Sequence, residues 1–154
     1  MLIFLDIDGV MVPAKGWKSP EMAGDGFPMF SSESVEVINQ LNTTETTILL
    51  TTSHKSKYTL AEWKAIFIKR GIRFNQLNCL DSSSLALSRR EEILNWFKSN
   101  QVNQPFIIID DDKSLNDLPK KIKDNLLLTS PFIGLTQSHL DEIKTILKNQ
   151  LQVA

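Results

Sequence analysis

The stretch Leu2–Val10, LIFLDIDGV, decides the fold class and the chemistry of this chain of 154 residues. Its first four residues are apolar and predict a short buried strand, which ends at Asp6 and Asp8. Side chains two residues apart in a strand point to the same side, so both carboxylates should converge. Because like charges repel and burial penalises each of them, the pair predicts a bound cation, typically Mg²⁺. Gly9 permits a tight turn and the close approach of a ligand to the backbone.

A second acidic cluster ends another apolar run. Pro105–Ile109 has the length of a strand and is followed by Asp110, Asp111 and Asp112. Taken alone, the first motif would also fit an Asp-rich turn after an edge strand. However, the carboxyl ends of parallel strands face one crevice, so two such ends gather four or five carboxylates around one point. Solvated surface charge would not favour that position.

Hydroxyl groups lie between the acidic clusters in the sequence. The apolar run Thr46–Leu50 predicts a strand that ends in Thr51, Thr52 and Ser53, whose hydroxyls suit a phosphate oxygen. Hydroxyl-rich strand ends are common in α/β proteins, so this signal depends on its place between the acidic clusters.

Two arginines occupy an unusual place in a predicted helix. Ser88 and Glu91 have the spacing of a capping box, which puts Arg89 and Arg90 in the first helical turn. Cations at this end oppose the helix dipole, at a cost of only about a few tenths of a kcal/mol if exposed. The pair either stands there by chance or balances carboxylates and holds phosphate.

In this order, the motifs resemble those of the haloacid dehalogenase-like (HAD) phosphohydrolases. Phe4–Val10 is similar to their first motif, hhDxDG[VT], and Leu49–Ser53 to the second, a strand ending in Thr or Ser. Ile107–Asp111 is similar to the fourth motif, a strand ending in an acidic pair. The third motif is a lone basic residue, for which we choose Arg89 and keep Arg90 as the alternative.

More narrowly, the chain is similar to small HAD domains found in, or related to, RNA-repair proteins. The supporting features are Thr51–Lys55, Arg89–Trp96, the Asp110–Asp111 pair and Gly134–Thr136. One departure is His54, which stands where that subgroup often has tryptophan.

The resemblance implies an aspartyl-phosphate mechanism. Asp6 would attack phosphorus, and Asp8 would protonate the leaving oxygen and then activate water. Thr52 and Arg89 would hold the oxygens of the transferring phosphoryl group. Further implied substrate contacts are Gly9, Ser53, Lys55 and Arg90.

The resemblance also implies a set of Mg²⁺ ligands. They are Asp6, the backbone carbonyl of Asp8, and Asp110 or Asp111. Asp112 is expected to begin the following loop. His54 and Lys55 are expected on the solvated rim, with a substrate contact open to them.

Composition favours one domain over residues 1–154. The chain is 42% hydrophobic and 23% charged, which indicates neither disorder nor a membrane span. The single cysteine, Cys79, suits a reducing compartment, so we expect a cytoplasmic protein. A net charge of −1 supplies no electrostatic footprint for nucleic acid.

Strand-like and helix-like segments alternate along the chain, which predicts a three-layer α/β/α sandwich with a central parallel sheet. The strand of residues 2–6 should be central, between 46–51 and 105–109. The other predicted strands are 72–77 and 126–129, and the predicted helices are 33–42, 57–70, 89–99, 115–124 and 137–151.

Residues 11–32 form a long connection where HAD proteins carry a flap and sometimes a cap domain. Some 20 residues are too few for a cap domain, so the resemblance implies an open, capless or minimally capped site. Phe27 and Phe30 are expected to anchor this loop, whereas Trp17 could line the entrance or anchor it.

Three other functions compete with a phosphatase. A phosphoacceptor receiver domain has similar residues in a different order. A catalytically idle HAD-like binding domain and a phosphotransferase to an acceptor other than water would both retain the motifs. The substrate could be a phosphorylated small molecule, a nucleotide or a nucleic-acid end, no membrane partner is expected, and the oligomeric state stays open.

Overall fold

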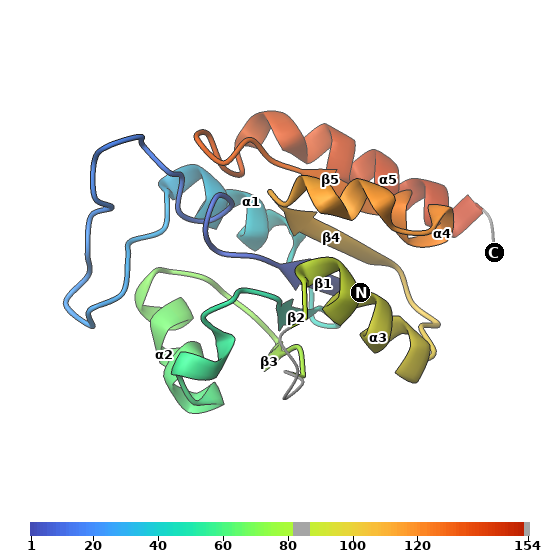
Figure 1. Cartoon of the computed structure of the whole chain (residues 1–154), viewed down its shortest axis with the longest axis horizontal. Helices are drawn as coiled ribbons and strands as arrows, with labels where there is room; N and C mark the ends of the chain where they lie inside the picture. The colour runs from blue at the N-terminus through green and yellow to red at the C-terminus, as the bar shows by residue number, and fades with distance from the viewer. Residues whose placement is uncertain (82–86, 153–154) are drawn as a thin grey trace.

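A computed structural model describes residues 1–81 and 87–152 and contains a five-stranded parallel sheet (Figure 1). The strand order is β3-β2-β1-β4-β5, with β1 in the centre between β2 and β4, as predicted. The strands are β1 Leu2–Leu5, β2 Thr47–Leu50, β3 Gln76–Cys79, β4 Phe106–Asp110 and β5 Leu126–Leu128.

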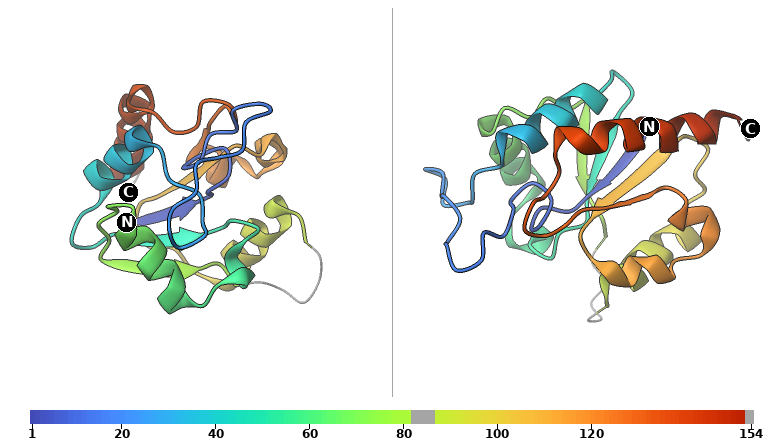
Figure 2. Two further views of the ribbon diagram at one scale, coloured as in Figure 1. Left: turned by 90° about the vertical axis from the view of Figure 1, so that its left-hand side faces the viewer. Right: turned by 90° about the horizontal axis from the view of Figure 1, so that it is seen from above.

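Helices cover both faces of the sheet (Figure 2), which confirms the predicted α/β/α sandwich. Successive side chains of β1 point to opposite faces, so Ile3 and Leu5 enter one core and Leu2 and Phe4 enter the other. The first core includes residues of α1 Ser32–Leu41, α2 Leu60–Lys69 and α5 Leu140–Gln152. The second includes residues of α3 Arg89–Ser99, the 3-10 helix η2 Lys113–Asp117 and α4 Lys120–Lys123.

Two predicted elements have different bounds in the structure, a strand that begins later than expected and a helix that is divided in two. The strand predicted at 72–77 begins only at Gln76, because the Ile72 N–H bonds to the Phe67 carbonyl at the end of α2. Ile72 is therefore a buried core residue outside the sheet. The helix predicted at 115–124 is divided at Pro119, whose ring disfavours helical backbone at the preceding residue.

Helix α2 begins three residues later than the predicted start at residue 57. The helix begins at Leu60, after a complete capping box between Thr59 and Glu62. Residues Lys55–Lys57 form a separate 3-10 helix, η1. The last predicted helix likewise divides into the 3-10 helix η3 Gln137–His139 and α5.

The connection between β1 and α1 is a long flap that projects from the sheet in Figure 1. Between Val12 and Ser31, the structure shows no helix or cap domain, only an isolated bridge between Met22 and Pro28. Phe27 and Phe30 are buried against α2, which confirms their anchoring role, whereas Trp17 is 90% exposed. In the described part of the chain, no helix has both the length and the apolar character to cross a bilayer.

Arg70, the buried residue that ends α2, fastens the flap to the body of the domain. Its guanidinium donates to both carboxylate oxygens of Asp25, at 2.7 and 2.8 Å. It also donates to the carbonyl oxygens of Phe27 and Pro28, at 2.7 and 2.8 Å. Hydrogen bonding from Arg70 holds the pKa of Asp25 well below its usual range.

We predict that Asp25→Asn lowers the melting temperature by about 2–4 °C at neutral pH, because a bidentate, charge-assisted pair is lost. A lowered folded-state pKa stabilises the fold above the ordinary carboxyl pKa of about 3.9 and ceases to do so as the pH falls further. The difference from wild type should therefore be constant from pH 5 to 8 in thermal melts and shrink below about pH 4. The matched control is Asp124→Asn, which removes the exposed pair with Lys120 and should change stability little. An equal effect of both variants would contradict the anchoring role.

Candidate active site

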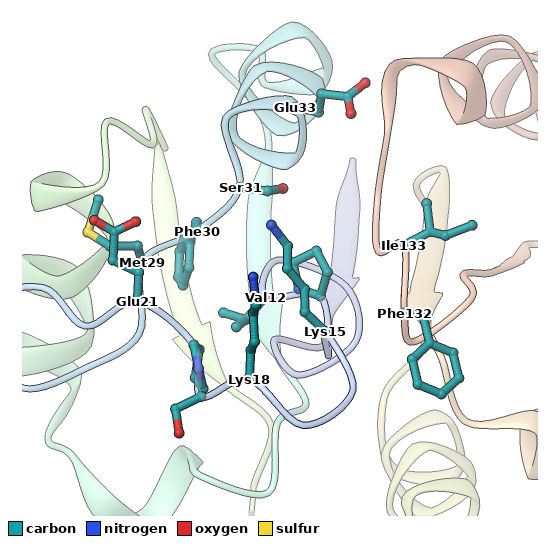
Figure 3. Close-up of a pocket in the computed structure, with 13 residues that line it drawn as sticks. Val12, Lys15, Lys18, Glu21, Met29, Phe30, Ser31, Glu33, Phe132 and Ile133 are labelled. Atoms are coloured by element: carbon teal, nitrogen blue, oxygen red, sulfur yellow. The ribbon is translucent and has the colours of Figure 1, made fainter.

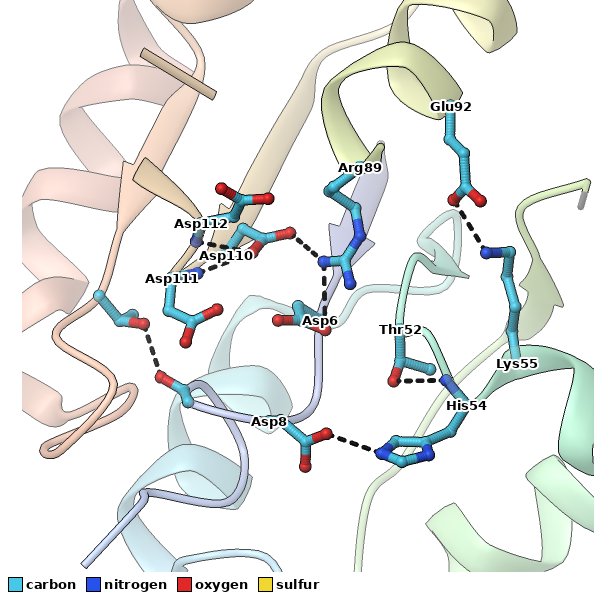
Figure 4. Close-up of polar contacts among 12 residues, drawn as sticks. Asp6, Asp8, Thr52, His54, Lys55, Arg89, Glu92, Asp110, Asp111 and Asp112 are labelled. Carbon is cyan, nitrogen blue, oxygen red and sulfur yellow. Dashed lines mark hydrogen bonds and ion pairs between the residues drawn. The ribbon is translucent and has the colours of Figure 1, made fainter. Parts of the chain in front are cut away.

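Three carboxyl groups meet at the carboxyl ends of β1 and β4. Asp6 follows β1, and Asp110 ends the neighbouring β4, where Leu5 pairs with Ile109. One carboxylate oxygen from each of Asp6, Asp110 and Asp111 lies within 4.8 Å of the other two. The structure thus brings Asp6 of the first motif and both acidic residues of the fourth to one point (Figure 4). The expectation that the Asp8 carboxylate converges there too, in a group of four or five, was wrong: β1 ends at Leu5, so Asp6 and Asp8 do not follow strand alternation, and the Asp8 side chain faces His54 instead.

Burial makes this carboxylate cluster electrostatically costly. Asp6 is 4% exposed and Asp110 is fully buried. Burial, followed by the charge of Asp110, raises the pKa of Asp6 to about 8, although Arg89 acts in the opposite direction. Burial also raises the pKa of Asp111, and the charge of Asp110 adds to the effect. Carboxyl groups in this state favour a cation among them.

Arg89 is the cation that the protein itself supplies to this cluster. Its Nη1 lies 2.6 Å from Asp110 Oδ2 and 3.2 Å from Asp6 Oδ1 (Figure 4). Burial is the largest single influence on the Arg89 pKa and acts to lower it, but Asp110 and Asp6 together raise it. These contacts explain a cation in the first turn of α3, where Ser88 caps the helix.

Arg90, the alternative for the third motif, lies elsewhere. Its guanidinium donates to the backbone carbonyl of Asp117 at 3.3 and 3.4 Å, and no contact with the carboxylate cluster is found among the described residues. The structure therefore distinguishes the two neighbouring arginines, which the sequence did not.

The turn after Asp8 lies directly against the cluster. Gly9 has a φ of +78°, and a side chain there would collide with Asp111 Oδ2. The Gly9 carbonyl accepts a hydrogen bond of 2.7 Å from the buried Thr129 hydroxyl. Thr129 follows β5, the neighbour of β4 in the sheet. The strand predicted at 126–129 therefore already placed a threonine hydroxyl at the same edge of the sheet as the acidic motifs, but we did not include it among the site residues.

The hydroxyl residues after β2 have different environments. Thr52 is buried, and its Oγ1 accepts a hydrogen bond from the His54 N–H at 3.2 Å, which leaves the hydroxyl proton free to donate. Thr51 Oγ1 is also buried and has no hydrogen-bond partner among the described residues. Ser53 is exposed.

Two side-chain contacts near the site were not predicted from the sequence. His54 Nε2 lies 2.7 Å from Asp8 Oδ2 (Figure 4). Lys55 Nζ lies 2.8 Å from Glu92 Oε2, and both of these side chains are largely buried. The expectation of a solvated Lys55 was therefore wrong, because η1 turns this side chain toward α3. Asp112 begins the loop as expected, and its side chain accepts a hydrogen bond from the Ser114 N–H.

A groove of about 480 Å³ opens beside the flap (Figure 3). Val12 lines this groove and also forms an isolated bridge with Asp8, so the groove lies next to the turn that follows Asp8. Phe132 and Ile133 line it opposite the flap and are 66% and 60% exposed. Its charged lining residues are Lys15, Lys18, Glu21 and Glu33. The two charges of each sign cancel, so the groove gives no electrostatic preference for a polyanion.

The arrangement as a whole suits a hard cation and an anion that is attacked by a carboxylate. The three clustered carboxyl groups offer only oxygen atoms, the ligands that Mg²⁺ prefers over softer donors. Arg89, which contacts both Asp6 and Asp110, has further charged hydrogen-bond donors to offer to an anion.

Comparison with known proteins agrees with this arrangement. Residues 2–140 match the family model described as the HAD domain in Swiss Army Knife RNA repair proteins. No curated protein and no solved structure gave a significant match. Because the family match covers most of the chain, including both acidic motifs and Arg89, the chain belongs to this family of HAD domains.

Proposed function

We propose that the protein is a Mg²⁺-dependent phosphomonoester hydrolase that works through a covalent aspartyl-phosphate intermediate. The observation that carries this proposal is the position of Asp6, which is buried beside Asp110 and Asp111 and lies 3.2 Å from Arg89 Nη1. A carboxylate in this setting has an electrostatic partner for an incoming phosphate and oxygen ligands for a cation beside it.

The proposed reaction has two displacements at phosphorus. A carboxylate oxygen of Asp6 forms a bond to phosphorus while the bond to the leaving oxygen breaks, and Asp8 gives its proton to that oxygen. Water then attacks the phospho-enzyme and loses a proton to Asp8, and the bond between phosphorus and Asp6 breaks. Arg89 and the Thr52 hydroxyl bind the phosphoryl oxygens throughout.

The residues present fit Mg²⁺. Asp6, the backbone carbonyl of Asp8, and Asp110 or Asp111 would hold the ion, and the absence of a side chain at Gly9 keeps space beside Asp111. When bound, Mg²⁺ neutralises charge between the carboxylates and the phosphate.

The substrate class is proposed from the family description. That description names RNA repair proteins, and the ends of an RNA strand can carry a phosphomonoester, so a terminal phosphate on an oligonucleotide is the first substrate to test. Nucleotides and phosphorylated small molecules have the same reactive group and belong in the same screen.

The test is a screen of phosphorylated metabolites, nucleotides and 3′- or 5′-phosphorylated oligonucleotides, with and without Mg²⁺, beside Asp6→Asn. Release of inorganic phosphate that needs both Mg²⁺ and Asp6 is expected. Phosphate transferred to another substrate instead of released would favour the phosphotransferase. No turnover of any compound would favour the idle binding domain.

We predict that the protein binds one Mg²⁺ and that Asp111→Asn weakens binding by about tenfold or more, since a charged ligand is lost. Asp112→Asn is the matched control, because its side chain caps η2, and should bind normally. Metal ligation needs the Asp6 carboxylate, whose pKa is raised to about 8, so the affinity should rise with pH up to about 8 and binding at pH 7 should release a proton. Titration calorimetry in buffers of different ionisation enthalpy measures both quantities. Equal binding by both variants, or no proton release, would contradict this site.

A further inference from the structure

His54 has no task in the reaction proposed above, although it touches one of the reacting residues. Its Nε2 lies 2.7 Å from Asp8 Oδ2. In the described part of the chain, His54 is the one side chain that forms a hydrogen bond with the Asp8 carboxylate. The Asp8 side chain is 59% exposed, so without this contact it would be free to move among rotamers. The direction of the Asp8 carboxyl group therefore depends on His54.

His54 is itself held from two sides. Its backbone N–H donates to Thr52 Oγ1, and its ring packs edge-on against Phe27, with ring centroids 6.1 Å apart and planes at 87°. Phe27 is 4% exposed, and Arg70 donates to its carbonyl oxygen. The imidazole thus lies on a rigid support made of the end of β2 and the anchored part of the flap.

The Asp8–His54 pair lies apart from the carboxylate cluster. Only Asp6, Asp110 and Asp111 form that cluster among the described residues, and in Figure 4 the Asp8 carboxylate points away from the other acidic groups and toward His54. The backbone of Asp8 can therefore serve the metal side of the site while its carboxyl group serves the opposite side.

We propose that His54 is a positioning residue: its Nε2 holds the Asp8 carboxyl group toward the oxygen of the leaving group. This role rests on the proposed function, because it gives Asp8 the task of proton donor. A general acid that is held in line with its acceptor spends more of its time in the reactive orientation, so it contributes more to the rate than a mobile one.

The role makes a prediction about leaving groups. An alkoxide leaving group needs a proton in the transition state, whereas p-nitrophenolate needs little help. Loss of His54 should therefore slow the hydrolysis of an alkyl phosphate much more than that of p-nitrophenyl phosphate. A purely structural role, or a contact with phosphate, would slow both reactions equally.

The experiment compares His54→Phe, which keeps the ring against Phe27 but removes the nitrogen, with His54→Gln, whose amide can replace Nε2. Ser56→Ala, at an exposed neighbouring position, is the control. In His54→Phe, kcat/KM for an alkyl phosphate should fall by about 10–100-fold, part of the 10²–10⁴ that a general acid contributes. This ratio reports the first displacement and not the hydrolysis of the phospho-enzyme, which both substrates share. For p-nitrophenyl phosphate kcat/KM should fall less than about threefold, and His54→Gln should recover most of the loss. Equal loss on both substrates, or no loss, would overturn the role.

A second measurement separates this role from the proposed function. The chain has two histidines, so ¹⁵N spectra of the imidazoles can be assigned with His54→Phe. The His54 Nε2 signal should move in Asp8→Ala and stay in Ser56→Ala, and an unmoved signal would show that the pair does not form. If the pair is present but no phosphomonoester is hydrolysed, the proposed function fails and the positioning role fails with it. If hydrolysis occurs without the leaving-group difference, only the positioning role is overturned.

Discussion

Asp6→Asn is expected to abolish hydrolysis of every phosphomonoester that the protein accepts. The amide retains the shape of the side chain but is a poor nucleophile and a weak metal ligand. Loss of a nucleophile typically removes most of the catalysed rate, so kcat should fall by about 10⁴-fold or more. The measurement is release of inorganic phosphate with the best substrate from the screen. Full activity in this variant would show that the nucleophile lies elsewhere.

Asp8→Asn provides the comparison that identifies a covalent intermediate. With p-nitrophenyl phosphate the first displacement should be partly spared, because this leaving group needs little protonation. The second displacement should remain slow, since no base activates water. Phosphate should therefore accumulate on Asp6 and be detected by mass spectrometry of the protein quenched at low temperature. No added mass in Asp8→Asn, with normal turnover in wild type, would favour direct attack by water.

The same Asp6→Asn substitution should stabilise the metal-free fold. Because burial and Asp110 raise the folded-state pKa of Asp6 to about 8, the unfolded state releases its proton first, and wild-type stability falls as the pH rises from about 4 to 8. Removing this ionisation should raise stability near pH 8 by an amount of the order of a few kcal/mol, at about 1.4 kcal/mol per pKa unit. Thermal melts in a chelator should show the gain at pH 8, and little gain at pH 4. A saturating concentration of Mg²⁺ should reduce or reverse it, because the ion binds the wild-type carboxylate.

The parts of the fold that could be predicted are those in which a short stretch of sequence specifies a single local structure. Leu2–Leu5 and Phe106–Asp110 are apolar runs that end in acidic residues, and parallel packing of such strands brings the acidic ends together. Ser88 was identified as a helix cap because a cap involves residues only three positions apart. Pro119 was a local signal as well, and the helix predicted across it was an error of interpretation.

The contacts that escaped prediction join residues far apart in the sequence. Asp8 and His54 are separated by 46 positions, and Lys55 and Glu92 by 37. Each of these side chains alone is typical of a solvated surface, and only the packing of η1 against neighbouring elements decides which polar groups meet. The choice between two adjacent arginines depends in the same way on the rotation of α3 relative to β4.

That choice gives a strong test of the site. Arg89→Met should lower kcat by about 10²–10³-fold, the effect of removing a charged donor from a developing phosphoryl transition state. It should also destabilise the fold by about 3–5 kcal/mol, because Asp110 would be left buried without its partner at 2.6 Å. Arg90→Met removes the same side chain one position further on, where its partner is a backbone carbonyl, and should change both quantities little.

Arg89→Lys separates the catalytic part of this loss from the loss of stability. Lysine keeps the charge near Asp110, so the fold should recover much of its stability. It lacks the planar fork by which one guanidinium contacts Asp110 and Asp6 together, so kcat should stay well below that of wild type. Thermal melts and initial rates on one phosphomonoester, measured for all three variants, decide the matter. If Arg90→Met were as damaging as Arg89→Met, the basic residue of the third motif would have to be reassigned, because proximity to Asp6 and Asp110 would no longer explain the activity.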